Sequence, residues 1–281
     1  MSLSKEEQLY NAAFDGELEK IKSLCSDPDL NINCQDEGGY TPLSGACHAG
    51  QIGIVEYLLS MKEIDPNKPS NDGATPFFIA CWNGYKEVVS LLLADPRVDP
   101  NKPVNDQSTP LWIASQQGHL VVVRHLLASK KEIDTRMRST FNKRTAAEQG
   151  RAMGRMTKRM YDIEEDFQRR RLKGPLCADL IDEYEHDRVA ARNRLRRLPG
   201  LREYFIGHLF ALVVFHSDNF VVTRDNADVS CKRFFDIASR LPLEVQMVLC
   251  NRVFGSPKDI ILSRDSEPGF KFLVRTTTWQ Q

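Results

Sequence analysis

The sequence has no long hydrophobic run. Its most apolar stretch, Tyr204 to Phe215, is followed by His216 and falls well short of the roughly 20 apolar residues that a membrane-spanning helix needs. We expect this stretch to form a buried helix, and we expect no membrane partner. The first residues are polar and acidic, without the charged and apolar regions of a secretory signal, so we also expect no export.

Paired cysteines are missing as well. The chain has 7 cysteines, an odd number, and they are scattered without a Cys-x-x-Cys pair. This usage favours reduced thiols over a disulfide framework or a zinc site. We therefore predict no metal ligands and a cytoplasmic protein, with the nucleus as the alternative location.

A third absence concerns catalysis. The sequence contains no P-loop, no Gly-x-Gly-x-x-Gly or Gly-x-Ser-x-Gly motif, no His-Glu-x-x-His zinc motif and no EF-hand loop. His208 and His216 lie two helical turns apart, too far to share a metal ion, and the adjacent Cys47 and His48 point in different directions on one helix. We predict no catalytic residue, no cofactor and no enzymatic activity. A site built from dispersed residues, which no motif would reveal, stays open as an alternative.

The charges are numerous but unevenly distributed. Residues 1–135 hold 11 Lys and Arg against 19 Asp and Glu, whereas residues 136–281 hold 27 against 19. Most of the basic excess falls between Arg136 and Arg202. This basic ridge can attract acidic partners, pair with the acidic part of the chain, direct the protein to the nucleus, or simply form a solvated helical face. Because no base-reading element accompanies it, we expect no nucleic-acid partner.

What the sequence does contain is a repeat. A Thr-Pro pair recurs every 34 residues, and a glycine keeps the same frame. The pairs begin at Thr41, Thr75 and Thr109, and the glycines are Gly16, Gly50, Gly84 and Gly118. Two markers in one frame, with Thr-Pro-Leu at two of the three pairs, make the sequence similar to the ankyrin-repeat family over about residues 5–168.

The resemblance implies that each repeat is a finger followed by two antiparallel helices. The threonine suits the helix N-cap, the proline suits the first helical position, and the glycine permits the turn that ends the helix. Val88, Val89 and Leu92 show the helical spacing of the second helix, whose apolar side faces the core. We predict an all-α ankyrin-repeat solenoid of helix pairs with short β-hairpin fingers, followed by an irregular α-helical C-terminal domain.

We count about five units, of which the outer two are caps. The first lacks the Thr-Pro pair, and the last, from Thr145 to Gly154, is shifted by two residues and should begin its second helix near Arg155. A closing helix should run to Lys173, end at Gly174-Pro175, and carry an apolar stripe of Met156, Met160, Ile163 and Phe167. Further helices are expected before Pro199, over Leu201–Phe215 and over Leu243–Phe254. We place the domains at residues 1–168 and 169–281.

In the ankyrin family, ligands contact the finger tips and the exposed side of the first helices, which together form a concave surface. By resemblance, the partner-binding residues of this chain are Glu37, Tyr40, His48, Asn71, Asp72, Trp82, Asn83, Asn105, Asp106, Trp112, Gln116 and Gln117. The histidine that usually follows Thr-Pro-Leu is replaced by Ser44, Phe78 and Trp112, so the hydrogen bonds of that histidine are not expected here. Trp82 and Tyr40 are the leading anchor candidates, since aromatic residues dominate binding hot spots.

These features predict a non-enzymatic, monomeric protein that binds a protein partner through its repeats. An alternative comes from residues 241–249, where Leu241-Pro242-Leu243-Glu244 opens an amphipathic helix and is similar to the start of an F-box. That resemblance implies an adaptor, whose repeats select a substrate while the C-terminal domain recruits a ubiquitin-ligase scaffold or carries an unrecognised activity. The same pattern also occurs as ordinary helix N-terminal chemistry.

Overall fold

A computed structural model describes residues 3–155, 164–199, 201–217, 234–235, 238, 241 and 243–253. The chain divides into two compact units, residues 1–192 and residues 193–281. Among the described residues, we find no helix whose length and apolar character would allow it to span a bilayer.

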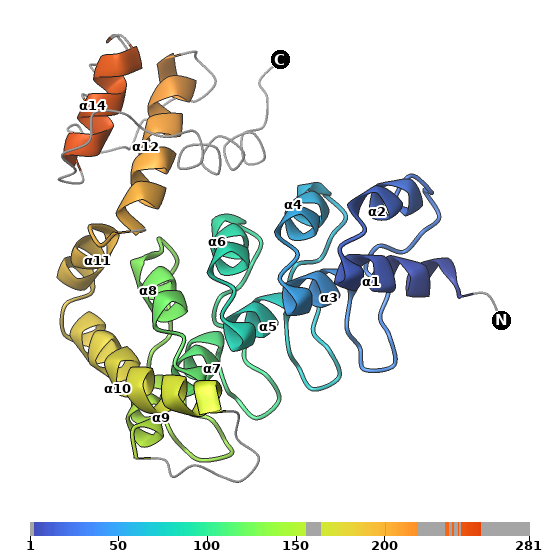
Figure 1. Ribbon diagram of the computed structural model, residues 1–281, viewed down its shortest axis with the longest axis horizontal. Coiled ribbons are helices and arrows are strands. Elements are labelled where there is room, and N and C mark those ends of the chain that lie inside the picture. The colour runs from blue at the N-terminus through green and yellow to red at the C-terminus, as the bar shows by residue number, and fades with distance from the viewer. Residues whose placement is uncertain are drawn as a thin grey trace. The chain divides into compact units, whose positions relative to one another are not determined.

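Two rows of short helices make up most of the first unit (Figure 1). The first row holds α1 (Lys5–Asp15), α3 (Pro42–Ala49), α5 (Pro76–Asn83), α7 (Pro110–Gln117) and α9 (Ala146–Met153). The second row holds α2 (Leu18–Leu24), α4 (Ile52–Ser60), α6 (Lys86–Ala94) and α8 (Leu120–Ala128). The helix pairs follow the 34-residue frame, which confirms the repeats that the sequence predicts.

The Thr-Pro pairs begin their helices as expected. Thr75 Oγ1 accepts a hydrogen bond from the backbone N–H of Phe78 over 3.1 Å, and Pro76 stands at the first helical position. Gly84 then ends the helix with a φ of +80°, a conformation that side-chain-bearing residues rarely adopt. Capping therefore fixes both ends of α5 locally.

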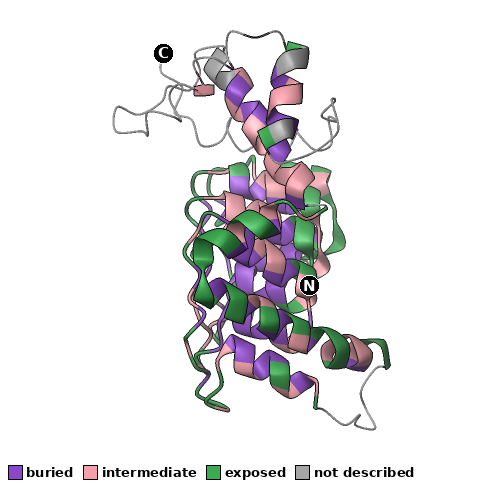
Figure 2. Ribbon diagram, turned by 90° about the vertical axis from the view of Figure 1, so that its left-hand side faces the viewer, coloured by how far each residue is buried: buried purple, intermediate pink, exposed green. Residues whose placement is uncertain are grey.

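The core lies between the two rows. Leu43, Phe77 and Leu111 occupy one repeat position and are almost completely buried, and so are Leu58, Leu92 and Leu126 of the second row. Figure 2 shows buried residues, drawn in purple, gathered inside the stack of helices. Because each helix pair buries its apolar side against its neighbours, the repeats share one continuous core.

The fingers are tight turns, and the expected β-hairpins are absent from the described residues. Each finger is closed by two backbone bonds, as in finger 2 (residues 70–74), where Ser70 N–H donates to Ala74 O over 3.0 Å and Gly73 N–H donates to Ser70 O over 2.9 Å. Finger 1 (residues 36–40), finger 3 (residues 104–108) and finger 4 (residues 139–144) close in the same way. Successive fingers are joined by single backbone hydrogen bonds, such as Asn71 N–H to Gly38 O at 2.9 Å, so no ladder of paired strands develops among the described residues.

A ladder of asparagine side chains joins the loops that run from the second-row helices to the fingers. Asn67 donates from Nδ2 to Arg97 O over 2.6 Å and accepts from Asp99 N–H over 2.8 Å. Asn33 and Asn101 make the same two bonds to the repeat that follows each of them. One side chain therefore satisfies two backbone groups of the next repeat, which fixes the spacing between neighbours.

The fifth unit departs from the frame. Thr145 caps α9 in a capping box with Glu148, but Gly154 has a φ of −60° in place of the left-handed turn. The expected second helix near Arg155 and the residues Met156, Met160 and Ile163 of the apolar stripe lie outside the described residues, whereas Phe167 is buried on α10 (Glu164–His186).

The expected break at Gly174-Pro175 is wrong, because α10 continues through it. Gly174 and Gly150 of α9 approach so closely that a side chain on either would collide with the other's carbonyl oxygen. Tertiary packing on α9 thus offsets the hydrogen bond that Pro175 cannot donate. The helix ends about three turns later, before Asp187, whose carboxylate accepts from Val189 N–H over 3.0 Å at the start of α11 (Arg188–Arg196).

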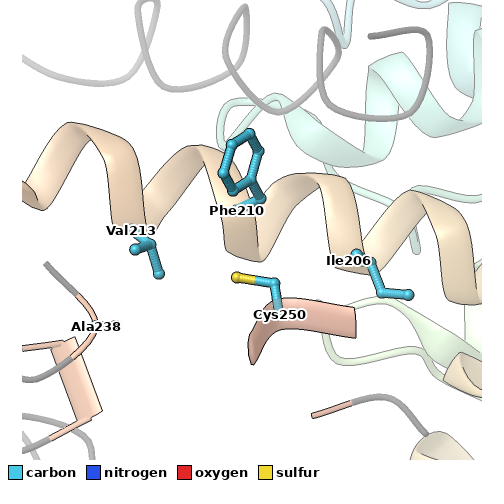
Figure 3. Packing of buried hydrophobic residues seen from close by; sticks show 5 residues of the cluster. All are labelled: Ile206, Phe210, Val213, Ala238 and Cys250. Carbon is cyan, nitrogen blue, oxygen red and sulfur yellow. The ribbon is translucent and has the colours of Figure 1, made fainter. Parts of the chain in front are cut away.

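In the second unit, α12 (Leu201–Ser217) and α14 (Leu243–Val253) confirm the predicted helices to within two residues. A small core forms between them, with Ile206, Phe210 and Val213 of α12, Ala238, and Cys250 of α14 (Figure 3). Cys231 and the C-terminal segment from residue 254 onward lie outside the described residues.

Candidate interaction surface

One position of the 34-residue frame is exposed near the C-terminal end of successive first-row helices. It is occupied by Phe14, His48, Trp82 and Gln116. The Phe14 and Trp82 side chains are 40% and 50% exposed, His48 is exposed and Gln116 is half-buried. The rings of Phe14 and His48 stack at 5.6 Å. We call Phe14, His48 and Trp82 the aromatic row.

Trp82 is supported from two sides. Its ring lies tilted against Phe78 at 6.2 Å, and Phe78 itself is buried. Its backbone carbonyl lies 2.8 Å from Nε2 of His119, a residue of the next repeat. The half-exposed indole therefore stands on a fixed backbone, which lowers the entropy that a partner must remove on binding.

Phe14 was not among the predicted site residues. The first unit lacks the Thr-Pro pair, which marks the equivalent positions in the three following repeats. The glycine frame contains the missing signal, because Phe14 precedes Gly16 by the same two residues that separate Trp82 from Gly84.

The predicted acidic residues stand on the first three fingers. Glu37 and Asp72 are exposed and Asp106 is half-buried. Asp72 accepts from Ser70 Oγ and Asp106 accepts from Ser108 N–H over 2.8 Å, but no described lysine or arginine pairs with either carboxylate or with Glu37. The first three fingers thus carry uncompensated negative charge.

The amide and phenol groups of the predicted site are partly used within the protein. Asn71 donates from Nδ2 to Glu37 O over 2.8 Å and Asn105 donates to Asn71 O over 3.0 Å, so both help to space the fingers. Asn83 donates to Ile79 O within its own helix over 3.1 Å. Tyr40 is half-buried, and burial together with the nearby Asp72 raises its pKa, so its hydroxyl stays protonated.

Two predicted site residues are buried in the described structure. Trp112 is 4% exposed and donates from Nε1 to Arg144 O over 3.1 Å. Gln117 is also 4% exposed, and its backbone carbonyl accepts from Nε of Arg169 on α10 over 3.0 Å. Like Ser44 and Phe78, Trp112 packs at the position of the family's histidine. The exposed surface therefore excludes Trp112 and Gln117.

The described cysteines are free and mostly buried, and burial raises the pKa of the Cys177 thiol to about 12. Such thiols are weak nucleophiles at neutral pH. In the part of the chain that the structure describes, no three His, Cys, Asp or Glu side chains are grouped so that they could hold a metal ion.

Part of the basic ridge is paired. Arg169 lies 2.7 Å from Asp166 and Arg188 lies 2.9 Å from Glu132, while Arg192 donates to the hydroxyl of Tyr184 over 2.8 Å. The first contact lies within α10, and the other two join α11 to the repeats and to α10. They favour the interpretation of these arginines as packing and solvated residues.

The F-box-like stretch begins just before α14. Gln246 is buried and donates to Leu241 O over 2.9 Å, and Leu249 packs against the core that α14 forms with α12. Leu243 is 50% exposed. The adaptor alternative stays a prediction.

Comparison with protein families identifies the repeats. A family model for ankyrin repeats in three copies matches residues 9–104, and a model for a single ankyrin repeat matches residues 106–138. Neither match extends into the C-terminal part of the chain. No curated protein matches the sequence.

Proposed function

Residues 9–138 are ankyrin repeats, which are generally non-catalytic modules that bind other proteins, and we propose that this chain grips its protein partner with the aromatic row and the acidic fingers. The partner would lie along the concave face, across the first-row helices and beside the fingers. Trp82 would be its main anchor, with Phe14, His48 and Tyr40 beside it.

The half-exposed Trp82 carries this proposal. A large aromatic side chain that is left in solvent on a rigid helix loses little entropy on binding and buries a large apolar area when covered. Its neighbours in the same frame extend that area over three repeats, so the surface suits an elongated segment more than a single side chain.

The acidic fingers define the chemistry of the partner's edge. Glu37, Asp72 and Asp106 have no cationic partner of their own in the described structure. A partner that brings lysine or arginine alongside the aromatic row would neutralise them, which favours one orientation and increases the rate of association.

Trp82→Ala tests the anchor. The partner is first captured with the full chain and identified by mass spectrometry, and its dissociation constant is then measured for both proteins. We expect a loss of affinity of at least about 30-fold, which corresponds to a hot spot of about 2 kcal/mol. The melting temperature should change little, because half of the side chain is already in solvent.

Val121→Ala is the matched control. Val121 of α8 is 44% exposed but lies in the second row, away from the aromatic row. Its removal should leave the dissociation constant unchanged. Equal affinities for the Trp82 variant and the unmodified protein would place the binding surface elsewhere.

A further inference from the structure

Finger 4 differs from the three fingers before it. Its outer closing bond runs from Ser139 N–H to Arg144 O over 3.1 Å and encloses four residues, whereas the outer closing bonds of the other fingers enclose three. The positive φ of the turn falls on Lys143, at +61°, in place of Gly39, Gly73 or Gln107. This longer turn presents Phe141 at its tip.

Phe141 is 82% exposed, the largest exposed fraction among the large apolar residues of the described chain. Hydrogen bonds hold the backbone of finger 4 in place. Thr140 donates its N–H to Asp106 O over 2.6 Å, Phe141 N–H donates to Ser139 Oγ over 3.2 Å, and Trp112 Nε1 holds Arg144 O. The finger therefore holds a phenyl ring in solvent on a fixed support.

The charges around Phe141 are opposite to those of the other fingers. Lys143 and Arg144 of finger 4 are exposed, and neither side chain makes an ion pair with a described carboxylate, although Arg144 donates to Gln149 Oε1 over 3.4 Å. Arg138, in contrast, is held 2.7 Å from Glu148. Finger 4 thus carries two cations without a carboxylate partner in the same turn as the exposed ring, while Arg138 stabilises the start of α9.

We propose that finger 4 is a second docking site, which binds an acidic protein segment that carries an apolar residue. The apolar residue would cover Phe141 and the flanking carboxylates would pair with Lys143 and Arg144. The charge of this site is opposite to that of the acidic fingers, so it would take a different ligand from the concave face or a different part of the same partner. It stands independently of the function proposed above.

The test uses the full chain and a phage-displayed library of random peptides, followed by affinity measurement on the enriched peptides. We expect enrichment of peptides with Asp or Glu next to an apolar residue. Phe141→Ala should weaken their binding at least about tenfold, as should the double variant Lys143→Glu with Arg144→Glu. Binding to the unmodified protein should weaken as salt is raised, since exposed charges are screened.

Two controls separate this site from other surfaces. Val189→Ala, which shortens another exposed apolar residue at 68% exposure, should bind the peptides normally. Trp82→Ala should also bind them normally, even if it has lost the partner of the concave face, so the two proposals fail separately. Melting temperatures of the finger variants should match that of the unmodified protein.

Three outcomes would overturn the proposal. One is the absence of any acidic and apolar peptide among the enriched sequences. Another is binding that survives the loss of Phe141. The third is cosedimentation of the protein with phosphatidylserine vesicles that depends on Phe141 and exceeds its peptide binding, which would assign the finger to an anionic lipid surface.

Discussion

Replacing His119 with Gln would isolate one contact between neighbouring repeats. His119 lies against Gly84, and its Nε2 lies 2.8 Å from Trp82 O. Two repeats earlier, Gln51 occupies the same position and donates from Nε2 to Phe14 O over 3.1 Å. Glutamine at position 119 should therefore keep the hydrogen bond while it removes the titratable ring.

The size of the effect follows from the pKa. Burial, together with the charge of Arg169, lowers the pKa of His119 to about 4, against the opposing effects of the Trp82 carbonyl and Asp166. In the unfolded chain a histidine titrates near 6.5. Between these values the unfolded chain binds a proton that the folded protein does not, so the folded state loses stability as the pH falls through 6.5 toward 4. At pH 5.5 this amounts to about 1 kcal/mol, and at pH 7.5 to almost nothing.

Urea unfolding followed by tryptophan fluorescence measures the difference. Between pH 7.5 and pH 5.5 the unmodified protein should lose about 1 kcal/mol more of its unfolding free energy than His119→Gln, because the carboxylates that both proteins share cancel in the comparison. His119→Ala, which also loses the hydrogen bond, should be less stable than His119→Gln at both pH values. Equal losses in the unmodified protein and the glutamine variant would refute the buried, neutral histidine.

Two further predictions concern the joints between repeats. Asn67→Ala removes both bonds to the next repeat and should lower the unfolding free energy by about 1–3 kcal/mol. The control Asn11→Ala, at an exposed position of α1, should change it by less than about 0.5 kcal/mol. Similar urea midpoints for the two variants would show that the asparagine ladder does not contribute to stability. Gly84→Ala should cost at least about 1 kcal/mol, because φ is +80° and the new methyl group would meet the His119 ring, whereas Gly53→Ala in open space within α4 should stabilise by about 0.5–1 kcal/mol. A melting temperature that rises in both glycine variants would contradict this account.

The features that depend on near neighbours were predictable from the sequence. A cap joins residues three positions apart and a helix-ending glycine acts on its own turn, so Thr75, Pro76 and Gly84 specify α5 without reference to the rest of the chain. The 34-residue frame then repeats this information along the stack. Even the shifted start of α9 at Thr145 could be read in this way.

The features that depend on distant packing were not predictable. Pro175 ends a helix in isolation, but contact with α9 keeps α10 intact. Gln117 occupies the frame position of the half-buried Asn83, yet it is buried, and Arg169, which lies far along the chain, contacts it. The β-hairpins were expected from the family, whereas each finger is a turn of five or six residues closed by two backbone bonds, too short to form paired strands.

The asparagine ladder has a consequence for the order in which the protein can form during synthesis. The side chains of Asn33, Asn67 and Asn101 each bond to backbone groups that lie 30 to 33 residues nearer the C-terminus. A nascent chain that has emerged as far as Asn67 has no acceptor or donor for that side chain until the loop around Asp99 has left the ribosome. The asparagine side chain of one repeat can therefore form these two bonds only after the next repeat has emerged. A ribosome that stalls within the stack leaves the last emerged asparagine of the ladder without them.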